Sequence, residues 1–144
     1  MVIQPGSVFQ RELLTEAECR GRLGGIDLAR VVLSVKCLPA ALPVIIELRD
    51  HHLLFASVED AVVDAARHGD VIAVQADGME TDGATWSVLV TGVGHQPEPT
   101  DALADVDGPS PLSRALDNGA TLVVLPLTVI TGQRIRWNFR PPSG

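Results

Sequence analysis

The chain has 144 residues, 46% of them hydrophobic, and a formal net charge of −7. This length suits a single domain with a sizeable core. An acidic chain lacks the positive charge that nucleic acids and anionic membranes attract, and its few aromatic residues offer no stacking platform for bases. The apolar runs are interrupted well before the roughly 20 residues that a membrane span needs. We therefore expect no nucleic-acid partner and no membrane partner, and the missing signal-peptide pattern favours the cytoplasm.

The first predicted element is an N-terminal arm, residues 1–12. Thr15 and Glu18 then have the spacing of a capping box, which predicts a short helix over residues 16–23. The single domain covers residues 13–137, and a flexible tail, residues 138–144, follows it. Predicted strands are apolar runs bounded by turn residues, and they cover residues 29–35, 44–48, 52–56, 71–76, 85–92, 122–125 and 128–137. One helix between the strands and two short helices elsewhere indicate a mainly β (α+β) chain forming a small antiparallel barrel.

The helix predicted after the third of these strands begins near Ser57 and ends near His68. A junction from strand to helix often holds a phosphate, because free N–H groups and the helix dipole face the anion. Here Glu59 and Asp60 occupy the first turn, where the dipole favours carboxylates, and Ser57 with Asp60 has a capping spacing. The residues thus predict that the N–H groups at the helix start already have hydrogen-bond partners and that the two carboxylates repel a phosphate.

Three motifs follow one another in the chain: Leu54-Phe55-Ala56-Ser57 before the predicted helix, TWSVLVTG at residues 85–92, and TGQRI at residues 131–135. Their order resembles the pyridoxamine 5′-phosphate oxidase-like family of flavin-binding split barrels, in its actinobacterial branch. The strand TWSVLVTG, residues 85–92, is similar to the family's G-W-S-V-x-V-x-G strand. Residues 131–135, TGQRI, resemble its terminal T-G-x-R-I, and Leu54-Phe55-Ala56-Ser57 precedes the inserted helix as in the family. The resemblance covers about residues 12–136. It implies an antiparallel split β-barrel with an N-terminal helix and one helix inserted after the third strand.

The resemblance also implies FMN-dependent redox chemistry, or binding of a deazaflavin, at the interface of a homodimer. Its implied cofactor-binding residues here are Ser57, Trp86, Ser87 and Arg134. The family's phosphate grip, Arg-Thr after the strand and Ser-Lys entering the helix, is degenerate. Ala56 and Ser57 stand at the first pair, and Ala61 and Val62 stand at the second.

Several roles stay open at this stage. Trp86 either lines a cofactor pocket, with Ser87 donating to a ring heteroatom, or anchors a subunit interface. A phosphate could still be held by another arginine, namely Arg30, Arg49, Arg134 or Arg136. Otherwise the chain is a cofactor-free homodimeric barrel that binds a small apolar ligand or has a stress-related role.

Metal and nucleophile motifs give no further candidates. His51 and His52 are adjacent on a strand and point to opposite faces, so they form a poor chelate, and we expect no metal site. Cys19 and Cys37 match no metal spacing, and we expect reduced, buried thiols. No nucleophile elbow is present, so catalytic residues are not assigned.

Overall fold

The computed structural model describes residues 9–137, so residues 1–8 of the expected arm and the expected tail, 138–144, lie outside the described residues. One eight-stranded antiparallel sheet has the order β1-β8-β6-β5-β2-β3-β4-β7. The elements are β1 (Phe9–Leu13), α1 (Glu16–Leu23), β2 (Leu28–Val35), β3 (Leu38–Arg49), β4 (His52–Ser57), α2 (Asp60–His68), β5 (Val71–Met79), β6 (Thr85–Val93), the 3-10 helix η1 (Ala102–Ala104), α3 (Pro111–Asp117), β7 (Thr121–Pro126) and β8 (Val129–Trp137).

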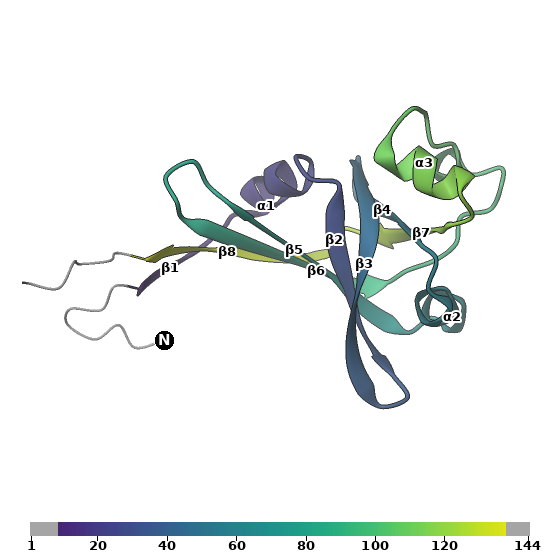
Figure 1. Ribbon diagram of the computed structural model, residues 1–144, viewed down its shortest axis with the longest axis horizontal. Helices are drawn as coiled ribbons and strands as arrows, with labels where there is room; N and C mark the ends of the chain where they lie inside the picture. Colours follow the sequence, from purple (N-terminus) through teal and green to yellow (C-terminus); the bar gives the residue numbers. More distant parts are fainter. Residues whose placement is uncertain (1–8, 138–144) are drawn as a thin grey trace, which may run out of the picture.

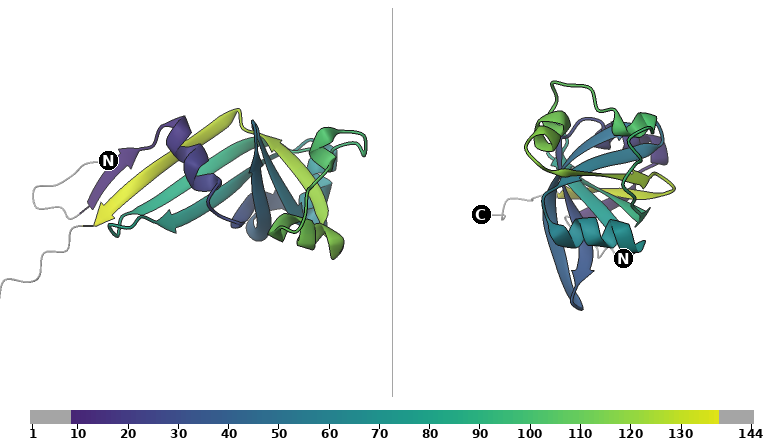
Figure 2. Two further views of the ribbon diagram at one scale, coloured as in Figure 1. Left: turned by 90° about the horizontal axis from the view of Figure 1, so that it is seen from above. Right: turned by 90° about the vertical axis from the view of Figure 1, so that its right-hand side faces the viewer.

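The sheet closes into a barrel where the chain leaves β6. The His95 N–H donates to the Val124 carbonyl at 2.9 Å, and the Val124 N–H donates to the His95 carbonyl at 2.8 Å. Strands β5, β2, β3, β4 and β7 complete the ring, while β8 and β1 continue the sheet on the side of β6 that faces away from β5. Figures 1 and 2 show this extension pointing away from the barrel. The predicted mainly β, antiparallel split barrel is therefore confirmed.

Strand β4 is buried on both faces, which explains its unbroken apolar sequence. Leu53 and Phe55 pack in the main core, whereas Leu54 and Ala56 pack in a second cluster with Leu112 of α3. Helix α3 covers the outside of the barrel at this point (Figure 1). Strand β4 thus belongs to both apolar clusters.

The helices agree largely with their predicted positions. The predicted capping box of α1 is present, with Thr15 and Glu18 bonded to each other's backbone N–H groups. Helix α2 follows β4, which is the third strand of those predicted, since β1 lies within the expected arm. Gly69 ends α2 at φ 69°, a left-handed conformation that glycine adopts without strain. Among residues 9–137, no helix is long and apolar enough to cross a membrane.

The prediction for β3 was wrong, because the strand begins at Leu38 instead of residue 44. Pro39 and Pro43 lie inside it, paired with Ser34 and Arg30 of β2. Strand β4 pairs with β3 only from Ile45 onward. Both prolines therefore sit where β3 has a neighbour on one side only, and a missing N–H costs no ladder hydrogen bond there.

The turn between β2 and β3 corrects the prediction for one cysteine. Lys36 and Cys37 form this turn with positive φ values of 50° and 64°, as a two-residue hairpin turn requires. Cys37 is exposed, whereas Cys19 of α1 is fully buried, and both thiols are free. Only Cys19 is thus the buried thiol that the sequence led us to expect.

Candidate functional site

The outer face of the sheet, turned away from the core, carries the polar side chains that are best placed to meet a ligand. Arg30 of β2 pairs in register with Gln75 of β5, and Asp77 pairs with Ser87 of β6. Gln75 links the two rows, because its Nε2 donates to Asp77 Oδ1 at 2.7 Å and to Ser87 Oγ at 3.3 Å. We call Arg30, Gln75, Asp77 and Ser87 the outer-face site.

Two hollows of about 240 Å³ each meet at Gln75. The first lies between β2 and β5 and includes Arg30, Pro43 and Asp77. The second lies over β6, β8 and β1 and includes Ser87, Gln133 and Arg11. Gln75 and Asp77 matched no motif, so the sequence did not single them out, and Asp77 lies beyond the predicted strand, residues 71–76.

Arg30 differs from the other arginines that the sequence offered as phosphate ligands. Arg134 is held by carboxylates, Arg136 is paired with Asp82, and Arg49 bonds to Glu47 at 2.9 Å and to the Asp105 carbonyl at 2.8 Å. Arg30 is exposed and forms no ion pair or side-chain hydrogen bond with another described residue. Among these arginines, it is the one whose guanidinium is available to an anion.

The start of α2 is closed to a phosphate. The expected cap between Ser57 and Asp60 was wrong: the helix begins at Asp60, and Glu59 is its N-cap without a side-chain bond. The buried Ser57 Oγ instead accepts from the Glu59 N–H at 3.1 Å. Val62, at the position of the family's lysine, has 0% exposure and packs in the main core. A cation at that position would point into the protein.

Trp86 lies mainly inside the protein, with 7% of its surface exposed. Its indole covers Gly78 so closely that a Cβ there would come within 2.5 Å of the ring. The ring also borders a hollow of about 410 Å³ with Met79 and Ile135. Trp86 therefore helps to build the core while one edge reaches a surface depression.

The predicted site residues do not converge. Trp86 and Arg134 are direct neighbours across β6 and β8, and Ser87 points to the opposite face from Trp86. Ser57 ends β4, which the sheet order separates from β6. Of the four, Ser87 belongs to the outer-face site.

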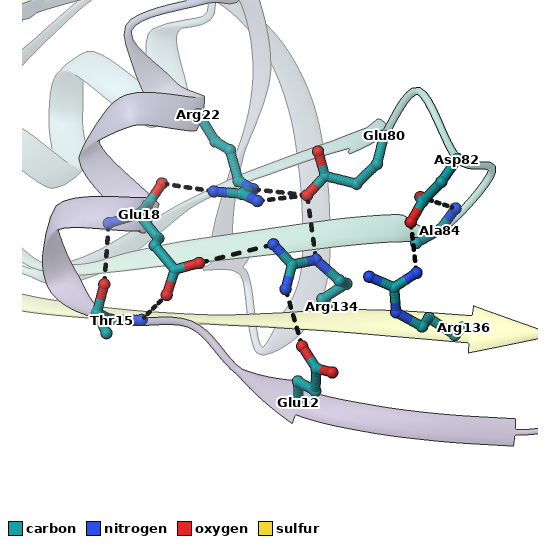
Figure 3. A network of polar contacts seen from close by, with 9 residues as sticks. All are labelled: Glu12, Thr15, Glu18, Arg22, Glu80, Asp82, Ala84, Arg134 and Arg136. Carbon is teal, nitrogen blue, oxygen red and sulfur yellow. Dashed lines mark hydrogen bonds and ion pairs between the residues drawn. The ribbon is translucent and has the colours of Figure 1, made fainter.

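Arg134 lies at the centre of an ion-pair network that joins distant parts of the chain (Figure 3). Its guanidinium nitrogens lie 2.8 Å from Glu12, 3.6 Å from Glu18 and 3.3 Å from Glu80. Arg22 of α1 pairs with the same Glu80. The network therefore holds α1, β1 and the β5–β6 turn against β8. The guanidinium of Arg134 is already paired with carboxylates and is not available to a ligand.

These contacts lower the pKa values of two carboxyls in the network. Hydrogen bonds from Thr15, with Arg134 and Arg22 nearby, lower the pKa of Glu18. Hydrogen bonds from Arg22 and Arg134 lower the pKa of Glu80. A carboxyl whose pKa is lower in the folded chain stabilises the fold above its unfolded-state pKa, and this contribution disappears as the pH falls through the folded-state pKa.

We therefore expect the free energy of unfolding to fall as the pH drops through the folded-state pKa values of Glu18 and Glu80. In an Arg22→Met variant, the free energy of unfolding should depend less on pH. The variant removes the largest cause of the lowered Glu80 pKa. Urea unfolding at a series of pH values between neutrality and the acid range measures the effect. An unchanged pH dependence in Arg22→Met would contradict this role for Glu80.

Other groups suited to chemistry are sparse. Burial raises the pKa of the Cys19 thiol, so it is a poor nucleophile. Within residues 9–137, no group of three or more His, Cys, Asp or Glu side chains is placed to hold a metal ion. The outer-face site thus offers a cation, the carboxylate of Asp77 and two further hydrogen-bonding side chains, which suit binding of a polar ligand.

Comparison with known proteins agrees with the fold. The family model for pyridoxamine 5′-phosphate oxidase matches residues 15–126. An FAD-binding protein from Mycobacterium smegmatis is 24% identical, with a TM-score of 0.65 over 91% of this chain and 100% of its own. An FAD-binding protein from Mesorhizobium loti is 19% identical, with a TM-score of 0.75 over 88% of this chain and 98% of its own. A search of curated proteins gave no match.

The structural likenesses are below 25% identity and establish a shared fold. The family model is independent of them and spans most of the chain, from the N-cap of α1 to the end of β7. This chain belongs to the pyridoxamine 5′-phosphate oxidase family.

Proposed function

We propose that this protein binds a flavin nucleotide, FMN, on the outer-face site, with a deazaflavin as the alternative cofactor. The observation that carries the proposal is Arg30, whose exposed guanidinium has no ion pair within residues 9–137 and lies at the edge of a hollow of about 240 Å³. A guanidinium binds phosphate oxygens through two parallel hydrogen bonds. Gln75 and Ser87, beside it on the sheet, supply hydrogen-bonding groups for the polar edge of a flavin ring.

Two solved proteins of the same fold support a flavin as the class of ligand. The solved proteins from Mycobacterium smegmatis and Mesorhizobium loti are described as FAD-binding. When bound, FMN would supply electron or hydride transfer, so the proposed activity is that of an FMN-dependent oxidoreductase. Function in the cytoplasm is part of the same proposal.

We further propose a homodimer that covers the outer face and encloses the flavin. Apolar side chains are exposed around the site, including Leu28 at 62%, Val129 at 55% and Leu89 at 38%. Apolar surface that is gathered on one face commonly marks an interface, because burying it removes it from water. The assembly mass is measured by light scattering over a range of protein concentrations.

A titration with FMN, followed by flavin fluorescence, tests the proposal. We expect saturable binding, and an Arg30→Met variant is expected to raise Kd by about tenfold to a hundredfold, since hydrogen bonds to charged groups contribute about 1.5–3 kcal/mol. Arg67→Met is the matched control, because Arg67 is an exposed arginine at the end of α2 that lines neither hollow. Equal weakening in both variants would contradict a specific role for Arg30.

A cofactor-free homodimer with a binding or stress-related role is the second candidate function. Ala56, Ala61 and the buried Val62 favour it, because they replace the family's phosphate grip with apolar side chains. A purified protein that binds neither FMN nor a deazaflavin would support this second function and contradict the first.

A further inference from the structure

Arg11 of β1 places a second exposed guanidinium on the outer face of the sheet. Its neighbour Glu12 points to Arg134 on the face that carries α1 (Figure 3), so Arg11, one residue earlier in the strand, points to the opposite face. Arg11 is exposed and forms no ion pair or side-chain hydrogen bond with another residue of the described range, 9–137. Like Arg30, it is therefore available to an anion.

Arg11 lies at the edge of the second hollow, of about 240 Å³, which extends over β6, β8 and β1. Among the described residues that line this hollow, Arg11 is the one with a charged side chain. The wall also contains hydrogen-bonding and apolar side chains, namely Ser87, Thr131, Gln133, Leu13 and Leu89. The hollow thus suits a small molecule that has one anionic group and a partly apolar body.

The position of this hollow brings its occupant next to the proposed flavin. The two hollows of the outer face share one lining residue, Gln75, and the flavin ring is proposed to contact Gln75 and Ser87. Ser87 also lines the second hollow. Transfer between two molecules requires that their reacting atoms be about 3–3.5 Å apart. A molecule in the second hollow is therefore in the place that a substrate of the flavin needs.

The charges around the second hollow favour a carboxylate over a phosphate. A guanidinium binds either group through two parallel hydrogen bonds. However, the second negative charge of a phosphate would find no further cation among the described lining residues. Asp77 would also repel it, because Asp77 pairs in register with Ser87 and accepts a hydrogen bond from Gln75 at the border of the two hollows. A carboxylate carries the single charge that Arg11 balances.

We propose that the second hollow binds a small organic acid, with Arg11 pairing to its carboxylate, and that such acids are the substrate class of this protein. The volume of the hollow is below the ~300–1,000 Å³ of sites for drug-sized ligands, so the acid is small. The role as substrate rests on the proposed function. Binding of the acid does not, because Arg30 does not line this hollow.

Three probes with the same phenyl group test the proposal on the full chain without flavin. Benzoate has a carboxylate, benzamide is its uncharged analogue, and phenyl phosphate carries up to two negative charges. Amide NMR spectra follow the titrations and report which residues the probe approaches. We expect saturable binding of benzoate, about tenfold or more tighter than that of benzamide. Equal binding of these two probes, or tighter binding of phenyl phosphate, would overturn the assignment of a carboxylate.

Matched variants locate the probe. Arg11→Met is expected to weaken benzoate binding by about tenfold to a hundredfold and to leave benzamide binding unchanged. Arg67→Met is the control, because Arg67 is exposed and does not line this hollow. Thr131→Phe fills the hollow at an exposed position of β8 and is expected to weaken binding of both probes. Unchanged benzoate binding in Arg11→Met, or an equal loss in Arg67→Met, would overturn the proposal.

Two arginine variants keep this proposal separate from that of flavin binding. Arg30→Met is expected to lose FMN affinity and to keep benzoate affinity, whereas Arg11→Met is expected to do the reverse. Benzoate binding by a protein that binds no flavin would contradict the proposed function and leave the acid site standing. Loss of benzoate binding as the protein associates, measured by light scattering, would show that a second copy fills the hollow and would overturn the acid site.

The role of the acid as substrate has its own test. In protein saturated with FMN, benzoate is expected to shift the absorbance spectrum of the bound flavin, because both ligands meet at Gln75. An unchanged spectrum while benzoate binds would overturn the substrate assignment. Displacement of FMN by benzoate would overturn it as well, since the two molecules would then occupy one place.

Discussion

A Val62→Lys variant is expected to lose about 3–5 kcal/mol of unfolding free energy, the cost of an uncompensated buried charge. The family resemblance invites this substitution, because it would restore the lysine of the phosphate grip. However, Val62 is fully buried and packs in the main core. The ammonium would lie among apolar side chains without a partner. Urea unfolding measures the loss, and an FMN titration is expected to show no gain in affinity.

The neighbouring position provides the control. Ala61 is partly exposed at the same turn of α2, so a lysine there extends its charge into water. We expect Ala61→Lys to change the unfolding free energy by about 1 kcal/mol or less. If Val62→Lys proved as stable as Ala61→Lys, residue 62 would have to face solvent, and the described orientation of α2 would be contradicted.

A Gly132→Ala variant is expected to lose about 1–3 kcal/mol of unfolding free energy, because the added methyl group overpacks the contact between β8 and α1. A Cβ at residue 132 would lie 2.6 Å from the Sγ of Cys19 and 3.2 Å from the Ser87 carbonyl. The Cys19 side chain is fully buried and has little space to move away. Thermal or urea unfolding of the variant measures the cost.

A double-mutant cycle assigns this cost to the named contact. Cys19→Ala removes the sulfur and is expected to relieve most of the clash, so the double variant should lose less than the sum of the single variants. For side chains in contact, the coupling is about 0.5–3 kcal/mol. Additive losses would mean that the Ser87 carbonyl or Leu14, and not Cys19, limits the space at residue 132.

In the candidate site, residue type alone did not predict which arginine is available to a ligand. The resemblance named Arg134 as a cofactor ligand, but in the fold its charge is shared among Glu12, Glu18 and Glu80. Glu12 and Arg134 are 122 residues apart in sequence. No local pattern reveals such a pairing, because it exists only where β1 lies beside β8. Arg30 was one arginine among several until the pairing of the others was known.

The amino-acid sequence by itself determined the features that depend on neighbouring residues. The capping box of α1 and the motifs of the family could both be recognised, because short-range hydrogen bonds and strand alternation repeat within a few residues. The split barrel followed from the order of those motifs.

Only the tertiary structure decided which side chains meet. It joined His95 to Val124 to close the barrel, and it left Pro39 in a part of β3 without a second neighbour. It also turned Val62 inward and left Arg30 on the outer face without an ion pair to any residue that the structure describes. These outcomes depend on contacts between segments that are far apart in the chain and that meet when their apolar faces are buried together. The local spacing of residues therefore does not predict such contacts.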